Sequence, residues 1–194
     1  LSGLAIRWQL VCGDPLWVDE LHTSWVLSGT WSQVAPRAIA GNQSPLYFWC
    51  SYPLVQWLGQ SPFSLRLVSL LAGCLLIPVG AWMVWRRTRS TLGAATTALA
   101  LACESNLIFY STEARPYGLV QLLGLLFAGA LFRRLEETQA GPAWDAIFLS
   151  ALLVLLHPTA LLVTLPLALL LFFAKRQPER SEEHTSELQS HSDL

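Results

Sequence analysis

Hydrophobic residues gather along the chain in runs close to the length of about 20 residues that crosses the hydrocarbon core of a bilayer. Residues 1–11 have the composition of the end of one such run. Complete runs follow at residues 65–85, 92–110, 117–132, 144–156 and 159–174. The last two are short for full spans, which suits tilted helices or a thin region of membrane. The pattern predicts an all-α, polytopic transmembrane helical bundle.

Residues 12–62 have a mixed composition, rich in Trp, Pro, Gly, Asn and Gln. Within them, residues 45–59 (PLYFWCSYPLVQWLG) are apolar and aromatic, but they are too short to span comfortably and contain Pro53. Tyr and Trp side chains favour the depth of the lipid headgroups. We therefore expect an interfacial or re-entrant helix at residues 45–59, within a large loop on one side of the membrane.

Basic residues follow alternate runs, in the stretches RRTR (86–89), RRLEE (133–137) and KRQPER (175–180). The positive-inside rule places these three connections on the cytoplasmic side. The opposite, outer side then receives residues 12–62, 111–116 and 157–159. This assignment gathers several ionisable residues that are distant in sequence on the outer face: Asp19, Glu20, Glu113, Arg115 and His157.

Composition agrees with a membrane protein. The 194 residues are 53% hydrophobic and 13% charged, and the mean hydropathy is +0.44. A net charge of −1 gives no sign of nucleic acid binding. The four cysteines match no zinc or CxxC spacing. Cys74 and Cys103 lie in apolar runs as small hydrophobic residues, whereas Cys12 and Cys50 are candidates for a disulfide if both face an oxidising side.

The last fifteen residues, 180–194, differ sharply from the apolar sequence before them. Residues 180–191 read RSEEHTSELQSH, which is the in-frame translation of a common sequencing-adapter read. We therefore expect residues 180–194 to be adapter read-through rather than native protein, with a solvated charged tail as the alternative. Residues 1–179 then form the N-terminal part of a larger membrane domain, truncated at both ends.

The adjacent carboxylates Asp19 and Glu20 are the first candidates for chemistry. Neighbouring residues do not share a helical face, so the two side chains point in different directions. One can act as a general base while the other binds a metal ion or orients a reactant. The alternative is an exposed acidic turn that starts a helix, with Asp19 near its N-cap.

A second candidate is the stretch YSTEARPYGL at residues 110–119. Pro116 suits the start of a helix. Arg115 lies on the outer side, where the positive-inside rule disfavours it, and a guanidinium beside a helix start suits a phosphate or carboxylate. Glu113 either pairs with Arg115 or faces another cation. The alternative for this motif is a local ion pair that stiffens a short loop.

Four further residues are weaker candidates. Glu104 lies inside an apolar run, where carboxylates are costly and often functional. On a continuous helix its separation from Arg115 would place both on nearly the same face, which allows pairing. His22 and His157 are either hydrogen-bonded interface residues or contacts for a substrate or metal. Arg66, near the outer start of its run, is expected to anchor its helix to lipid headgroups.

Four stretches in order, LWVDELHTSW, NQSPLYFW, SPFSLRLVSLLAG and YSTEARPYGL, resemble the N-terminal half of membrane glycosyltransferases of the C superfamily (GT-C). The similarity is greatest to bacterial relatives of protein O-mannosyltransferases and aminoarabinose transferases, and it covers residues 16–174. Each motif is short and degenerate, so the order and the membrane sidedness carry the resemblance.

The resemblance implies an enzyme of the cytoplasmic membrane that transfers a sugar from a polyprenyl-phosphate donor to a glycan, lipid or protein acceptor. Transfer would occur on the periplasmic or outer face with inversion at the anomeric carbon. Asp19 matches the proposed catalytic base and Glu20 its neighbour. Glu113, Arg115 and Tyr117 match an outer loop, in which Arg115 would bind the donor phosphate.

One position departs from the family. Many relatives have HPPL where this chain has QSPL (43–46), so this chain lacks that histidine as a group to hold a metal or the acceptor. A divalent cation, Mg²⁺ or Mn²⁺, suits the outer carboxylates Asp19 and Glu20 but is not required by any motif. Two other functions stay open: a lipid or sugar transporter or flippase, and an inactive GT-C-like membrane protein.

Overall fold

The computed structural model describes residues 2–136 and 144–169, and every regular element in these two ranges is helical. The all-α expectation is therefore confirmed for the described residues. The helices are α1 (Ser2–Gly13), α2 (Val18–Leu27), α3 (Trp31–Ala40), α4 (Leu46–Leu58), α5 (Pro62–Thr88), α6 (Thr91–Cys103), α7 (Ser105–Ser111), α8 (Tyr117–Glu136), α9 (Trp144–Leu156) and a short 3-10 turn, Pro158–Ala160.

Local sequence signals explain where the central helix α5 starts and stops. The Ser61 hydroxyl accepts a hydrogen bond from the backbone N–H of Ser64, and Pro62 occupies the first turn, where it needs no N–H partner. At the other end Arg89 adopts a left-handed conformation with φ 55°. Ser90 then caps α6 by accepting from the backbone N–H of Gly93. The hairpin between α5 and α6 is therefore specified by a few residues.

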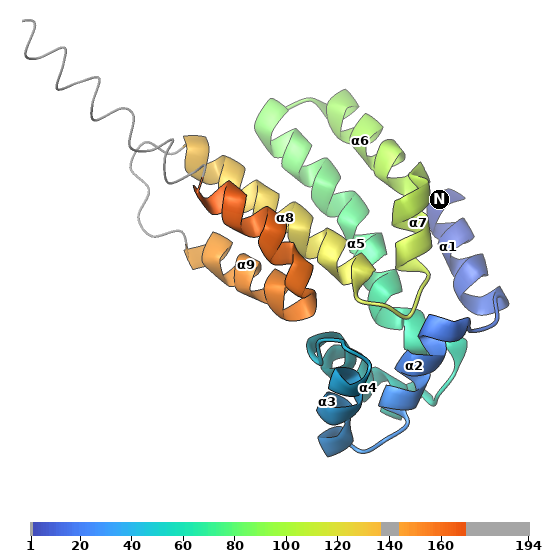
Figure 1. Ribbon diagram of the computed structural model, residues 1–194. Helices are drawn as coiled ribbons and strands as arrows, with labels where there is room; N and C mark the ends of the chain where they lie inside the picture. Colours follow the sequence, from blue (N-terminus) through green and yellow to red (C-terminus); the bar gives the residue numbers. More distant parts are fainter. Residues whose placement is uncertain (1, 137–143, 170–194) are drawn as a thin grey trace, which may run out of the picture.

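The helices form two groups (Figure 1). The long apolar helices α5, α6, α8 and α9 lie side by side, with α5 packed between α6 and α8. The shorter helices α2, α3 and α4 cluster at one end of this layer and join it through the start of α5. Close packing of α7 on α5 depends on Gly73, where a Cβ would lie 2.2 Å from the Cβ of Ser111.

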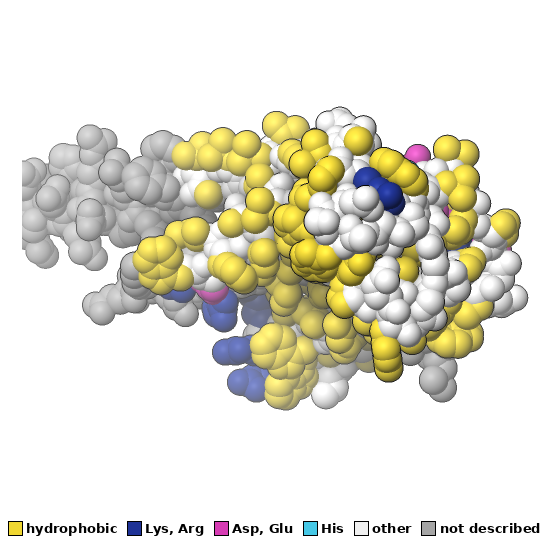
Figure 2. All heavy atoms as spheres, turned by 90° about the horizontal axis from the view of Figure 1, so that it is seen from below, with side chains coloured by type: hydrophobic (Ala, Val, Ile, Leu, Met, Phe, Trp, Pro, Cys, Tyr) yellow, Lys and Arg dark blue, Asp and Glu magenta, His cyan; other side chains and the backbone are white. Residues whose placement is uncertain are grey.

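Among the described residues, α5 is the one helix long and apolar enough to cross a membrane. The pair α6 and α7 becomes a second candidate if the two are counted as one span bent by 60°. Only 33% of the apolar window of α5 is buried, unlike the core helix of a soluble protein. Hydrophobic side chains also cover much of the face shown in Figure 2. These features support membrane association.

The individual spans differ from the sequence prediction. The run 92–110 is not one straight helix, because it breaks at Glu104 between α6 and α7. The apolar helices Trp144–Leu156 and Pro158–Leu169 are short, as expected, and residues 170–174 of the last run lie outside the described residues. Residues 45–59 do contain a helix, α4, with Pro53 inside it.

Two of the three basic stretches lie at one end of the long helices. The Arg87 guanidinium lies 5.0 Å from the ring centroid of Phe132, which joins the last turns of α5 and α8. Arg133 and Arg134 both pair with Asp145 at the start of α9. The third basic stretch, residues 175–180, lies outside the described residues, as does the expected adapter-derived segment 180–194. The four cysteines are unpaired, so the Cys12–Cys50 disulfide is not present.

Candidate functional site

Glu20 and Arg66 form a buried ion pair between α2 and α5. The Glu20 side chain is fully buried and Arg66 is 3% exposed. Arg66 Nε donates to Glu20 Oε1 at 2.7 Å, and Nη2 donates to Oε2 at 2.5 Å. This two-point geometry between a guanidinium and a carboxylate is the strong form of such a pair. Glu20 is therefore held inside the protein, away from any reactant at the surface.

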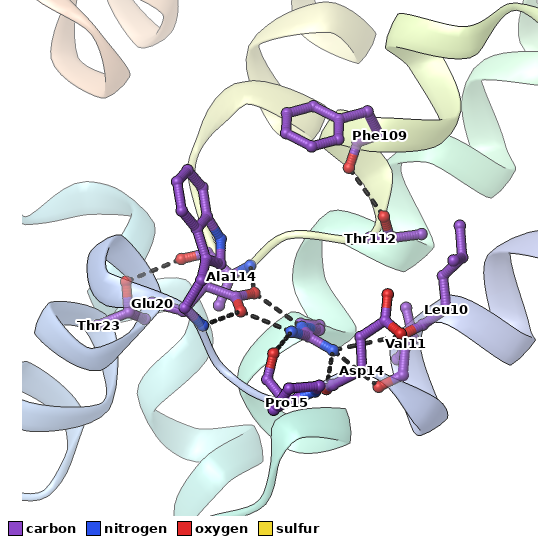
Figure 3. Close-up of polar contacts among 11 residues, drawn as sticks. Leu10, Val11, Asp14, Pro15, Glu20, Thr23, Phe109, Thr112 and Ala114 are labelled. Atoms are coloured by element: carbon purple, nitrogen blue, oxygen red, sulfur yellow. Dashed lines mark hydrogen bonds and ion pairs between the residues drawn. The ribbon is translucent and has the colours of Figure 1, made fainter.

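Arg66 also binds the chain that connects α1 to α2, where Figure 3 labels Asp14 and Pro15. Its Nη1 and Nη2 groups donate to a series of backbone carbonyls, those of Leu10, Val11, Asp14 and Pro15, at 2.9 to 3.3 Å. These bonds satisfy carbonyls that the end of α1 leaves without helical partners. The expectation that Arg66 anchors its helix to headgroups is wrong, because the side chain points inward and is fully occupied.

The loop at residues 112–116 is fixed by side chains of two neighbouring helices, α2 and α5. The backbone N–H of Ala114 donates to Glu20 Oε1 at 2.8 Å, and the Ala114 carbonyl accepts from Thr23 Oγ1 at 2.8 Å (Figure 3). Ser69 Oγ donates to the Arg115 carbonyl at 2.7 Å. Because Glu20 and Thr23 both belong to α2, they fix the position of Ala114 relative to this helix from both sides of its peptide unit. The predicted meeting of these distant segments is thus present.

Asp19 and Arg115 face each other across that junction. Arg115 Nη2 lies 4.0 Å from Asp19 Oδ2, and the Asp19 side chain is 52% exposed whereas Arg115 is 12% exposed. The orientation of the Gln43 amide that satisfies its neighbours places its oxygen 2.5 Å from Arg115 Nη1 and 3.3 Å from Nη2. The guanidinium also lies 5.8 Å from the ring centroid of Tyr117, and its Nε has no hydrogen-bond partner within residues 2–136 and 144–169.

Glu113 lies beside this pair but does not bind it. Its side chain is 6% exposed, and no hydrogen bond or ion pair to its carboxyl group is present among the described residues. Burial raises the pKa of Glu113 to about 7, and the charge of Glu20 acts in the same direction. Of the two alternatives for Glu113, an ion pair with Arg115 is not formed, because Arg115 contacts Asp19 instead.

Aromatic rings continue from Arg115 toward α9. The rings of Tyr117 and His157 are 5.8 Å apart, and those of Tyr117 and Tyr110 are 5.0 Å apart. His157 Nδ1 lies 2.6 Å from Thr159 Oγ1. Tyr117 and His157 thus belong to the same end of the molecule as Asp19 and Arg115, as the span order predicts.

Two candidates take other roles. Glu104 caps α7, because its carboxylate accepts from the backbone N–H of Leu107 at 2.6 Å and from Asn106 at 3.0 Å. The bend at Glu104 removes the continuous helix on which pairing with Arg115 was predicted. His22 packs in an apolar setting, with its ring 6.1 Å from that of Phe48 and against Gly41. Neither His22 nitrogen has a hydrogen-bond partner in the described part of the chain.

A metal-binding role for Glu20 does not fit this geometry. Both of its oxygens accept N–H groups, which leaves no carboxylate face for a cation. In residues 2–136 and 144–169, no group of three or more His, Cys, Asp and Glu side chains is arranged to hold a metal ion. Of the two carboxylates predicted as ligands, Asp19 alone keeps accessible oxygens.

Comparison with known proteins finds no matching family model, no matching curated protein and no matching solved structure. The site therefore has to be interpreted from its own geometry. Sequence reasoning missed Arg66 as the partner of Glu20 and Gln43 as a neighbour of Arg115. An arginine inside the apolar stretch SLRLVSLL (64–71) was the one signal for Arg66, because a cation there requires a counter-charge.

Proposed function

We propose that this chain is part of a membrane glycosyltransferase that takes a sugar from a polyprenyl-phosphate donor. The observation that carries the proposal is the juxtaposition of Asp19 and Arg115. An accessible carboxylate and a guanidinium lie 4.0 Å apart at one end of a set of apolar helices. In this proposal Asp19 is the base and Arg115 the phosphate-binding group, and their place at the helix ends supports access by a lipid-linked donor.

In the proposed reaction, Asp19 accepts the proton of an acceptor hydroxyl. The acceptor oxygen attacks the anomeric carbon and forms the new glycosidic bond with inversion. The bond between that carbon and the phosphate oxygen breaks, and the polyprenyl phosphate departs with the electron pair. Arg115 stabilises the negative charge on the departing phosphate. Without the donor, the guanidinium faces the Asp19 carboxylate and the Gln43 amide oxygen instead.

Glu20 has a supporting role in this proposal. Glu20 is the neighbour of Asp19 in the chain. It also binds the backbone N–H of Ala114, the residue that precedes Arg115. Its pair with Arg66 would thus set the separation of base and phosphate-binding group. Tyr117 and His157 extend the same surface and are proposed to contact the donor sugar or the acceptor. Glu104 and His22 have no proposed contact with substrate.

The proposed setting is a multi-pass arrangement in the cytoplasmic membrane, with residues 12–62 on the periplasmic or outer face. The exposed tryptophans of the α2–α4 cluster suit the headgroup region: Trp25, Trp31, Trp49 and Trp57. A divalent cation, Mg²⁺ or Mn²⁺, is a further expectation for the donor phosphate, with Asp19 as the carboxylate available to it. The acceptor is proposed to be a glycan, lipid or protein hydroxyl.

The test uses the full-length protein in lipid nanodiscs with a radiolabelled polyprenyl-phosphate sugar. Wild type is compared with Asp19→Asn and with a matched control, Asp145→Asn, which removes a carboxylate at the opposite end of the long helices. Transfer by wild type and the control, with loss in Asp19→Asn, supports the proposal. Equal transfer by all three proteins would overturn the assignment of Asp19 as base.

A transporter or flippase is the second candidate, because one observation favours it. The apolar segment Thr91–Ser111 is broken at Glu104 with a 60° bend, and broken helices are typical of transporter binding sites. Its carboxylate is used within the break as a helix cap, however, and the other candidate residues gather at the helix ends. Movement of labelled lipid across a vesicle membrane without sugar transfer would favour this function over the enzyme.

A further inference from the structure

A cavity of about 530 Å³ opens between the end of α1, the start of α2, and α7. Its lining comes from these elements, from α5 and from the loop before α8, and includes Asp14, Trp17, Arg66, Phe109 and Glu113. Asp19 and Arg115 are not part of its lining. The volume falls within the range of about 300–1,000 Å³ that is usual for small-molecule sites. The cavity is thus distinct from the face on which sugar transfer is proposed.

Glu113 gives this cavity its chemical character. The side chain is buried to more than nine tenths, it lines the cavity, and its carboxyl group has no hydrogen-bond or ion-pair partner among the described residues. The carboxyl oxygens of Glu113 are not among the fully buried polar atoms of the described residues, so they are accessible from the cavity. The group is therefore available to a ligand that enters the cavity.

The charges around Glu113 determine what kind of ligand it can accept. Arg66 is the cation in the lining, but its N–H groups are used by Glu20 and by four backbone carbonyls. A guanidinium has five N–H donors, so none is left for a ligand. Arg115 faces Asp19 and Gln43 instead. Arg66 and Arg115 lie close enough to favour the ionised form of Glu113, but among the described residues each of them pairs with another carboxylate, Glu20 or Asp19.

The remaining lining is mostly apolar and aromatic, with two hydroxyl residues, Ser105 and Thr112. Trp17 and Phe109 are both large exposed side chains at the cavity, and aromatic faces attract organic cations. We propose that this cavity binds a positively charged amino group, with Glu113 as the counter-charge and Trp17 and Phe109 as aromatic contacts. Because the pKa of Glu113 is about 7, a bound cation would favour the ionised carboxylate near neutral pH.

An ammonium group can come from two sources: a phospholipid with an amine headgroup, or a soluble amine. Both present the same chemistry to Glu113. The proposal does not depend on glycosyl transfer, because binding at the cavity can be measured without a donor. Failure of one proposal therefore leaves the other intact.

The probe is dansylcadaverine, a fluorophore with a primary ammonium group, titrated into the protein in phosphatidylcholine nanodiscs at pH 8. The neutral control probe is the matching dansyl derivative that ends in a hydroxyl group. We expect saturable binding of the ammonium probe to wild type, and binding at least about tenfold weaker for the hydroxyl probe. Glu113→Gln keeps the shape of the side chain but removes its charge, so this variant should bind the ammonium probe at least about tenfold more weakly than wild type.

A second variant separates ligand binding from folding. Asp145→Asn removes a carboxylate far from the cavity and should bind the ammonium probe like wild type, with thermal unfolding followed in each sample. Competition by soluble ethanolamine identifies a free amine, whereas competition in nanodiscs that contain phosphatidylethanolamine identifies the lipid headgroup. Equal affinity of wild type and folded Glu113→Gln for the ammonium probe would overturn the proposal, as would equal affinity for the two probes.

Discussion

The carboxylate of Glu20 and the guanidinium of Arg66 meet at two points, at 2.7 and 2.5 Å, inside the protein. This pair connects segments that are far apart in sequence, because Arg66 also holds the end of α1 and Glu20 also holds Ala114. Asp19 precedes Glu20, and Arg115 follows Ala114. The buried pair is therefore the physical link between the fold and the accessible Asp19–Arg115 pair.

Removing the Glu20 charge should strongly destabilise the protein. In Glu20→Gln the Arg66 guanidinium stays buried without a counter-charge, which typically costs about 3–5 kcal/mol. Unfolding followed by circular dichroism in detergent measures the loss. The matched control is Asp145→Asn at the partly exposed pair with Arg133 and Arg134, where a change below about 1 kcal/mol is expected.

Exchanging the two charges should not restore stability. Arg66 is surrounded by carbonyl oxygens, and Glu20 accepts a backbone N–H group. In the double variant Glu20→Arg with Arg66→Glu, the new carboxylate would meet carbonyl oxygens and the new guanidinium would meet an N–H donor. The double variant should unfold at or below the temperature of Glu20→Gln. Recovery to the wild-type unfolding temperature would show that the pair acts through its charge alone.

Glu113 should make stability depend on pH. Its pKa is raised to about 7 in the folded protein from an ordinary 4.5, so the folded state holds the proton more tightly. The resulting stabilisation is complete below about pH 4.5 and is lost as pH rises through about 7, with a total of up to about 3 kcal/mol.

The pH effect is measured by comparing the unfolding free energies of wild type and Glu113→Gln between pH 4.5 and 8. At pH 8 the Gln variant should be the more stable protein, because it lacks a buried charge. A wild type that is equally stable or more stable than Glu113→Gln at pH 8 would contradict the burial argument.

Packing of α7 on α5 should not tolerate a side chain at Gly73. A Cβ there would lie 2.2 Å from the Cβ of Ser111, so Gly73→Ala should destabilise by about 1–3 kcal/mol. Gly124 in α8 is the control, because nothing lies within 4 Å of its added Cβ. Gly124→Ala should be neutral or stabilising by up to about 1 kcal/mol, and equal losses at both sites would rule out close packing at Gly73.

Much of this arrangement could be predicted from the sequence. Apolar run lengths gave the long helices, and the alternation of basic stretches predicted that Asp19, Glu113, Arg115 and His157 would share one end. The meeting of these residues at one end is confirmed, because the order and length of the helices decide which loops share an end. The membrane side on which they lie stays a prediction. The expectation of several full spans goes beyond the one long apolar helix and one bent pair among the described residues.

The contacts within the site could not be predicted in the same way. Glu20 and Arg66 are separated by 46 residues, and nothing in the sequence of either helix specifies the other as its partner. Likewise, the break at Glu104 arises because its carboxylate caps α7, whereas hydropathy alone describes a continuous apolar run. Pairing and bending depend on tertiary contacts, which hydrophobic periodicity does not encode.

The most direct test of the central claim compares Asp19→Asn with Arg115→Gln in the full-length protein. Donor affinity and the transfer rate at saturating donor are measured for each variant. If Asp19 is the base and Arg115 binds the phosphate, Asp19→Asn should lower the rate by at least about 100-fold and keep donor affinity, whereas Arg115→Gln should weaken donor binding. An Asp19→Asn rate within a few-fold of wild type would contradict the account.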